Sequence, residues 1–204
     1  LFAPVSVGSF PMAEEERAWT KGPWAVEIGG RRGPMTRLLL DDGAEAWTET
    51  SKLELLPEGT VPLRGRLGRY ISVATGRDSS RIAIDAEGRF PFEITHTVEP
   101  LAIELRFFGA SQRFDRVRHA GGDPVVRDIR WRQESSRVAV VSIDTRLRWG
   151  WGYDAYYDER GRFVLELRRP PDLSGSGSVL AGRRVVVDPG HGPQRGYSAA
   201  RRCT

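Results

Sequence analysis

Several residue types that mark special classes of protein are scarce in this sequence. Among its 204 residues there is one cysteine, Cys203, which excludes an intrachain disulfide and any cysteine-rich zinc cluster. No apolar run approaches the roughly 18 residues of a membrane-spanning helix, so we expect no transmembrane segment. The chain begins at Leu1, and no charged and apolar leader is visible. We therefore expect it to start inside a longer protein, without a signal peptide of its own.

Lysine is scarce as well, since Lys21 and Lys52 are the only two, and almost all positive charge is arginine. The net charge of +4 suits an anionic partner such as nucleic acid, anionic lipid or a wall polymer. However, the 27 acidic residues are interspersed with the basic ones, which favours a solvated surface of mixed charge. No nucleic-acid motif and no glycine-rich phosphate loop accompanies the arginines, so we predict no nucleic-acid partner.

What the sequence does contain is a succession of short alternating segments. Apolar and polar residues alternate with the period of a half-buried strand, most regularly at Arg81–Asp85 and Leu101–Phe108. Many such segments, roughly ten residues apart and without long amphipathic helices between them, predict a sandwich or barrel that is mainly β. Further strands are expected at 24–28, 35–40, 44–48, 70–74, 90–94, 125–131, 137–143 and 163–167.

Proline and glycine divide these segments into parts. Asp41-Asp42-Gly43 is a hairpin-type turn, and the prolines and glycine of 57–62 indicate a linker. Gly175-Ser176-Gly177-Ser178 indicates a second, flexible linker. We expect an irregular N-terminal segment, a small β module, a larger β region, a flexible linker and a C-terminal segment, at residues 1–23, 24–57, 63–171, 172–182 and 183–204.

One stretch combines aromatic and charged residues at high density. Arg148, Trp149, Trp151, Tyr153 and Asp154 fall within seven positions. Clustered aromatic rings pack against the C–H faces of sugars, and Arg148 and Asp154 would bond to sugar hydroxyls. Alternatively, Trp149, Trp151 and Tyr153 share one face of a strand and fill the core, because alternate residues point the same way. The sequence leaves both interpretations open.

A motif near the C-terminus offers a second candidate site. Val185-Val186-Val187 is typical of a short buried strand, and Asp188-Pro189-Gly190 ends it in a turn that presents His191. A strand, a turn and a solvated histidine are the alternative. With its lead-in Leu180-Ala181-Gly182-Arg183-Arg184, the motif Val185–Gly192 resembles the opening of the zinc-dependent N-acetylmuramoyl-L-alanine amidases of bacterial cell walls. That resemblance implies that His191 is the first zinc ligand.

The preceding β regions resemble domains that accompany such amidases. Residues 63–171 are similar to an AMIN-type β-sandwich, and residues 24–57 are similar to part of a bacterial SH3-like barrel. The resemblance of the larger region rests on Leu105–Ala110, Asp128–Trp131, Val138–Ile143, Trp151–Tyr153 and Phe163–Pro171. It implies binding to peptidoglycan or to an envelope partner, and a location in the periplasm or cell envelope.

The implied activity is hydrolysis of the amide between N-acetylmuramic acid and L-alanine. In this class of amidase two histidines and a glutamate hold Zn²⁺, and a further glutamate is the general base. Only the first ligand, His191, has a counterpart here, and residues 193–204 depart from the usual continuation. We therefore expect the segment 183–204 to be a truncated start of the catalytic domain, with no catalytic residue present and no activity of its own. The alternative is a non-enzymatic, peptidoglycan-binding envelope protein.

Overall fold

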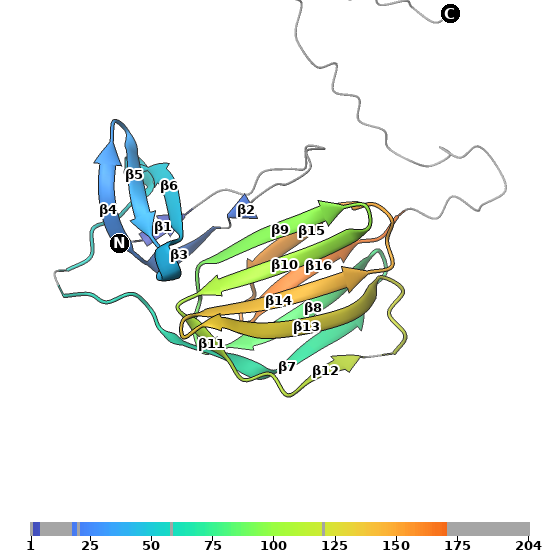
Figure 1. Ribbon diagram of the computed structural model, residues 1–204. Coiled ribbons are helices and arrows are strands. Elements are labelled where there is room, and N and C mark those ends of the chain that lie inside the picture. The colour runs from blue at the N-terminus through green and yellow to red at the C-terminus, as the bar shows by residue number, and fades with distance from the viewer. Residues whose placement is uncertain (1, 5–17, 20, 58, 120, 171–204) are drawn as a thin grey trace, which may run out of the picture. The chain divides into compact units, whose positions relative to one another are not determined.

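Short strands make up most of what the structure describes. The computed structural model describes residues 2–4, 18–19, 21–57, 59–119 and 121–170 (Figure 1). The chain divides into two units, residues 1–170 and 171–204. All described residues belong to the first unit. The predicted linker at 172–182 and the predicted amidase start at 183–204, with His191, lie outside the described residues.

The described part is mainly β, as the sequence predicted. No helix among these residues is long and apolar enough to cross a membrane. The elements are β1 (Phe2–Pro4), β2 (Ala18–Trp19), β3 (Lys21–Ala25), β4 (Glu27–Arg32), β5 (Met35–Leu39), η1 (Asp41–Gly43), β6 (Glu45–Glu49), η2 (Thr50–Lys52), β7 (Gly65–Thr75), β8 (Ser79–Ala86), β9 (Phe92–Val98), β10 (Leu101–Phe108), β11 (Ala110–Gln112), β12 (Arg116–His119), β13 (Val126–Ser135), β14 (Val138–Thr145), β15 (Tyr153–Tyr157) and β16 (Phe163–Arg168).

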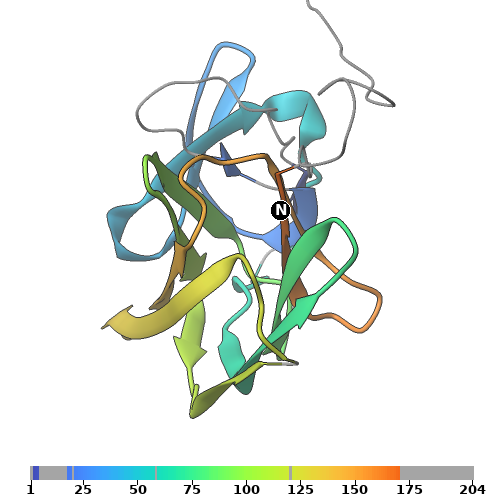
Figure 2. The ribbon, with the colours of Figure 1, turned by 90° about the vertical axis from the view of Figure 1, so that its right-hand side faces the viewer.

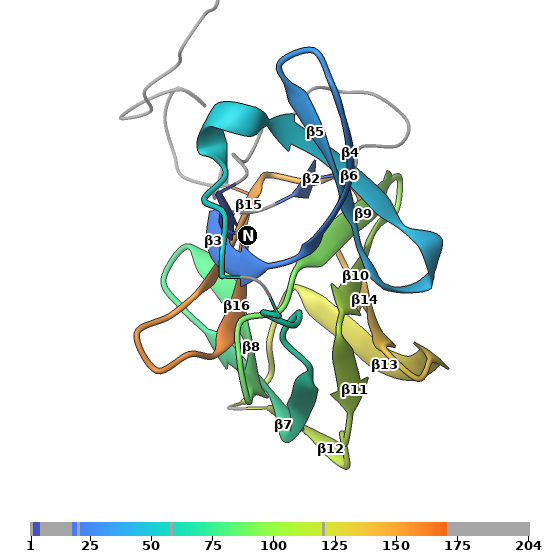
Figure 3. The same cartoon turned by 90° about the vertical axis from the view of Figure 1, so that its left-hand side faces the viewer.

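Two large sheets pack face to face and form what we call the two-sheet body. One has the strand order β13-β14-β10-β9-β2, and its pairs are antiparallel. The other has the order β11-β7-β8-β16-β15, and β12 also pairs with β7. Figure 1 views the body with β9, β10, β14 and β13 in front of β15, β16, β8 and β7. Figures 2 and 3 turn it so that the two layers are seen from the sides.

The predicted alternation explains how the two layers meet. Along β10, Leu101, Ile103, Leu105 and Phe107 are buried in the shared core, whereas the residues between them are half-buried. Strands β7, β8 and β16 contribute apolar side chains from the opposite layer. Because the side-chain period of a strand is two, each strand places one apolar face inside and one polar face outside.

An aromatic cluster joins the layers at the centre of this core. The ring of Phe163, on β16, lies 4.7 Å from that of Phe92 and 4.9 Å from that of Phe107, both edge-to-face. Tyr157 packs on Phe163 at 5.7 Å between ring centroids. Its hydroxyl donates to the carbonyl oxygen of Phe90 and accepts from its N–H, both at 3.0 Å. Burial raises the pKa of Tyr157 strongly, so its hydroxyl stays protonated.

The outer face of the five-stranded sheet carries charges of both signs in alternation. Arg132 bonds to Glu104 at 3.1 Å and to Glu134 at 3.0 Å, and Arg106 bonds to Glu134 at 3.1 Å. The hydrogen bond that Arg132 donates to Glu104 raises the pKa of Arg132, and Glu134 adds to the effect. This ladder shows how interspersed acidic and basic residues neutralise one another on a sheet surface.

A separate three-stranded sheet, which we call the small sheet, has the order β4-β5-β6. A turn at Gly33-Pro34 and the predicted turn at Asp41–Gly43 connect its antiparallel strands. The second turn forms the short 3-10 helix η1, in which Gly43 adopts a φ of 75°. The N–H of Leu40 donates to the carbonyl oxygen of Ala44 at 2.8 Å, and this hydrogen bond closes the turn.

The turn at η1 packs against one end of the two-sheet body. Phe108, Val138 and Val140 form a small buried cluster on the body, and Leu40 and Ala44 pack against it. The small sheet thus covers apolar residues that face away from the main core.

Two regions differ from the sequence expectation. The segment 1–23, predicted to be irregular, contains β1, β2 and the start of β3, and β1 pairs with β3. Strands β11 and β12 were not predicted, and both pair in parallel with β7. Strand β12 is polar and arginine-rich, so its sequence carries no apolar alternation, and its pairing depends on the neighbouring strand instead.

Candidate functional site

Two exposed tryptophans lie on one connection between the sheets. Residues 147–152, which we call the tryptophan loop, connect β14 to β15. The side chains of Trp149 and Trp151 are 51% and 48% exposed. Large apolar side chains that are gathered on one exposed loop are unusual enough to indicate a contact surface.

The ends of this loop are held to the sheets by backbone hydrogen bonds. At its start, the N–H of Leu101 donates to the carbonyl oxygen of Leu147 at 3.2 Å, and the hydroxyl of Thr145 donates to that of Leu101 at 2.7 Å. At its end, the N–H of Arg168 donates to the carbonyl oxygen of Gly152 at 2.9 Å. Gly152 has a φ of 101°, which a residue with a side chain adopts only with strain. These contacts limit the positions that the loop between them can take.

Charged groups flank the two rings. The guanidinium of Arg148 lies 4.8 Å from the ring of Trp149, and its Nε donates to Glu99 at 2.7 Å. On the other side of the loop, Asp154 pairs with Arg168 at 3.0 Å. These ion pairs are exposed and contribute little stability. Their oxygens and N–H groups remain accessible to hydroxyl groups of a ligand.

Tyr153 behaves differently from the two tryptophans. It is half-buried on β15, packs against the main core, and lies 6.0 Å from the ring of His96. The alternation that would place Trp149, Trp151 and Tyr153 on one strand face is therefore wrong, because β15 begins only at Tyr153. The prediction that these rings fill the core is wrong for Trp149 and Trp151 and fits Tyr153.

The predicted zinc ligand, His191, lies outside the described part of the chain. No group of three or more His, Cys, Asp or Glu side chains among the described residues is arranged to hold a metal ion. His96 is buried on β9, and His119 is exposed on β12. The zinc site around His191 therefore stays a prediction, and we derive no catalytic step through a metal.

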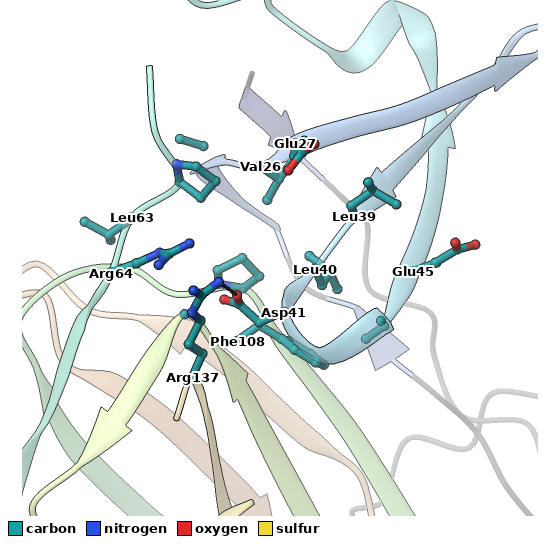
Figure 4. Close-up of a pocket in the computed structure, with 16 residues that line it drawn as sticks. Val26, Glu27, Leu39, Leu40, Asp41, Glu45, Leu63, Arg64, Phe108 and Arg137 are labelled. Atoms are coloured by element: carbon teal, nitrogen blue, oxygen red, sulfur yellow. Dashed lines mark hydrogen bonds and ion pairs between the residues drawn. The ribbon is translucent and has the colours of Figure 1, made fainter. Parts of the chain in front are cut away.

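A pocket of about 340 Å³ lies where the small sheet meets the two-sheet body (Figure 4). Asp41 and Arg137 form an ion pair beside it, with 3.2 Å between Arg137 Nη1 and Asp41 Oδ1. Three further charged side chains and an apolar wall complete the lining. The charged residues are Glu27, Glu45 and Arg64, and the largest apolar ones are Val26, Leu39, Leu40, Leu63 and Phe108.

A glycine allows the chain to approach closely beside this pocket. Gly109 follows β10 with a φ of 77°, and a Cβ atom there would lie 2.6 Å from the carbonyl oxygen of Leu63. The carbonyl oxygen of Gly109 accepts from the N–H of Gly65 at 3.1 Å. The absence of a side chain at Gly109 therefore lets the segment leading into β7 form one wall of the pocket.

The sequence analysis did not predict this pocket. Its charged residues come from positions 27, 41, 45, 64 and 137, and no local pattern connects them. The one local signal for the pocket was the turn Asp41–Gly43. Its acidic residues are equally typical of an ordinary hairpin turn, so they did not indicate a pocket. Comparisons with protein-family models, curated proteins and solved structures find no match to this chain.

Proposed function

We propose that this chain is the wall-binding region of a zinc-dependent N-acetylmuramoyl-L-alanine amidase and that the tryptophan loop contacts the glycan strands of peptidoglycan. The proposal includes an SH3-like module at 24–57, an AMIN-like sandwich at 63–171 and a location in the periplasm or cell envelope. The observation that carries it is the exposure of Trp149 and Trp151 on one loop held at both ends.

The chemistry of the loop favours a sugar as the ligand. A pyranose ring presents C–H groups on its face, which pack against an aromatic surface, and hydroxyls at its rim. Arg148 and Asp154 offer donors and acceptors beside the two indole rings. Because both charged groups already sit in ion pairs, they are oriented before a ligand arrives, which lowers the entropic cost of binding.

The catalytic part of the proposal rests on the motif around His191. When bound in such an amidase, Zn²⁺ activates a water molecule and polarises the amide carbonyl. In this chain we expect no hydrolysis, because only the first ligand of the motif, His191, has a counterpart in the sequence. The test is to incubate the chain with zinc and peptidoglycan and to measure released stem peptide. Release that His191→Ala abolishes would contradict this expectation.

Sedimentation with insoluble peptidoglycan tests the binding proposal. If each indole contributes about 1 kcal/mol, as aromatic contacts commonly do, removing both in Trp149→Ala/Trp151→Ala weakens binding roughly 30-fold. The matched control is Trp47→Ala, because Trp47 is 47% exposed but lies on β6 of the small sheet. Equal retention of the two variants in the pellet would contradict the assignment of the loop.

The alternative function is that of a non-enzymatic envelope protein that binds peptidoglycan. Reading the parent gene beyond this segment, in all frames, for a glutamate, a histidine and a second glutamate distinguishes the two. Both alternatives predict the same sedimentation result, so the gene sequence decides between them.

A further inference from the structure

The pocket between the small sheet and the two-sheet body has the size of a small-molecule site. Its volume of about 340 Å³ lies at the lower end of the range for ligand pockets, about 300 to 1,000 Å³. A sphere of that volume is roughly 9 Å across, which accommodates two extended residues at about 3.5 Å each. A folded partner or a long polymer is therefore excluded as the occupant of the pocket itself.

One wall of the pocket is fixed by interactions within the chain. The carboxylate of Asp41 is only 17% exposed and is held by Arg137. A guanidinium has five N–H donors, so Arg137 keeps donors available for a second acceptor. Phe108, which is 4% exposed, and Leu40 pack together beneath this pair. The ion pair and its apolar support give the pocket a preformed floor.

Two charges of opposite sign line the same pocket without partners among the described residues. Arg64 and Glu27 are both exposed, and neither makes an ion pair or side-chain hydrogen bond with another described residue. In Figure 4 the side chain of Arg137 reaches toward the middle of the pocket from the two-sheet body, and that of Arg64 does so from the segment before β7. Glu27 lies at the β4 end of the pocket. The pocket thus offers a cationic side and an anionic group.

Apolar side chains separate these charges. Leu39 and Leu40 come from the small sheet, and Leu63 comes from the segment before β7. Leu63 is 41% exposed, so a bound apolar group would cover it. A ligand complementary to this arrangement carries a carboxylate, an ammonium group and an apolar side chain between them.

We propose that this pocket binds a peptide of about two residues with free ends, its carboxylate at Arg64 and Arg137, its ammonium group at Glu27 and an apolar side chain against Leu63. Charge-assisted hydrogen bonds to the two ends determine the orientation, because they are stronger than neutral ones. The ligand class follows from the pocket alone and does not depend on the tryptophan loop.

The test is a calorimetric titration of the whole chain with alanyl-leucine and with its two blocked forms. N-acetyl-alanyl-leucine lacks the ammonium group, and alanyl-leucinamide lacks the carboxylate. We expect each blocked form to bind at least 5-fold more weakly than the free dipeptide. Equal affinity for all three, or no saturation by the free dipeptide at about 10 mM, which corresponds to less than about 3 kcal/mol, would overturn the proposal.

Single substitutions then assign each end of the ligand. Arg64→Gln should weaken the free dipeptide at least 5-fold and make it indistinguishable from the amide. Glu27→Gln should likewise weaken binding of the free dipeptide at least 5-fold and make its affinity indistinguishable from that of the acetylated form. The control is Arg66→Gln, because Arg66 is an exposed arginine that lies 4.0 Å from Glu87 and does not line the pocket. If Arg66→Gln weakens binding as much as Arg64→Gln, the assignment is wrong.

The tryptophan loop provides an independent comparison. The double variant Trp149→Ala/Trp151→Ala should bind the dipeptide as the unsubstituted chain does, because neither residue lines the pocket. A loss of dipeptide binding in this variant would count against the pocket as the site. If this variant loses peptidoglycan binding but keeps dipeptide binding, the loop and the pocket are two independent sites, and each proposal can fail without the other.

Discussion

Asp123 lies just before β13 and links this strand by hydrogen bonds to the end of β7. We predict that its carboxylate is a main determinant of stability. Its Oδ1 accepts from the N–H of Val125 at 2.9 Å and from that of Val126 at 2.7 Å. Its Oδ2 accepts from the hydroxyl of Thr75 at 2.9 Å. Val125 and Val126 are 1% and 2% exposed, so water does not replace the carboxylate as their acceptor.

The size of the effect follows from these contacts. Asp123→Ala leaves two buried N–H groups without an acceptor, at about 1–3 kcal/mol each, so we expect a loss of about 3–5 kcal/mol in the free energy of unfolding. Asp123→Asn keeps an acceptor but loses the charge. Because hydrogen bonds to charged groups contribute about 1 kcal/mol more than neutral ones, three such bonds predict a loss of about 2–3 kcal/mol.

The loss in the free energy of unfolding caused by Asp123→Asn should depend on pH. Burial alone would raise the pKa of Asp123, but the N–H of Val126, the nearby hydroxyls of Ser80 and Thr75, and the N–H of Val125 together outweigh it and lower the pKa. A lowered folded-state pKa gives stability that is present above the unfolded value of about 3.9 and is lost as the pH falls through the folded value. The gap between Asp123→Asn and the unsubstituted chain should therefore be largest near neutral pH and shrink on acidification.

Urea unfolding from neutral pH down to about pH 3 measures this gap, since the unfolded-state pKa near 3.9 lies within that range. The control is Asp85→Asn, because Asp85 is exposed on β8 and makes no ion pair with another described residue. We expect that variant to stay within about 0.5 kcal/mol of the unsubstituted chain. An asparagine variant at position 123 that is equally stable at neutral pH, or whose deficit does not change with pH, would refute the reasoning.

Four further predictions concern buried positions. Phe163→Ala removes the ring at the centre of the aromatic cluster and should cost about 3–5 kcal/mol in calorimetric unfolding, as core phenylalanines do. Tyr157→Phe leaves the N–H and carbonyl oxygen of Phe90 unpaired and should cost about 1–3 kcal/mol. In the unsubstituted chain, Tyr157 should not ionise near pH 10 in an ultraviolet titration, since burial raises its pKa. Gly109→Ala places a Cβ against Leu63 and should lower the midpoint of thermal unfolding, whereas Gly121→Ala, with open space around it, should lower it less.

The main strands were predictable because one face of each is buried. Leu101–Phe108 was predicted with the bounds that β10 has, and Arg81–Asp85 lies inside β8. In β10 the alternating burial imposes the alternating sequence, whereas in β8 the small Ala83 between Ile82 and Ile84 is buried as well. The same reasoning could not find β11, which is only three residues long, or β12, which is mostly exposed. Their place depends on β7, which lies far away in the sequence.

The candidate sites were predictable to different degrees. The composition of 148–154 drew attention to Trp149 and Trp151, but the alternation rule placed them on a strand that begins only at Tyr153. The pocket could not be predicted, since Asp41 and Arg137 meet only after the small sheet has packed on the body. A local sequence pattern reports which side chains are present, whereas long-range packing decides which of them face one cavity.

The packing of η1 on the body also bears on how this protein is best divided for experiment. Leu40 and Ala44 cover Phe108, Val138 and Val140 at one end of the five-stranded sheet. A fragment that begins at residue 63 would keep every strand from β7 to β16 but would leave this cluster open to water. Uncovered apolar patches promote self-association, so such a fragment should form soluble oligomers or precipitate on expression. Cutting the chain at the apparent linker 57–62 therefore separates two parts that protect each other from aggregation.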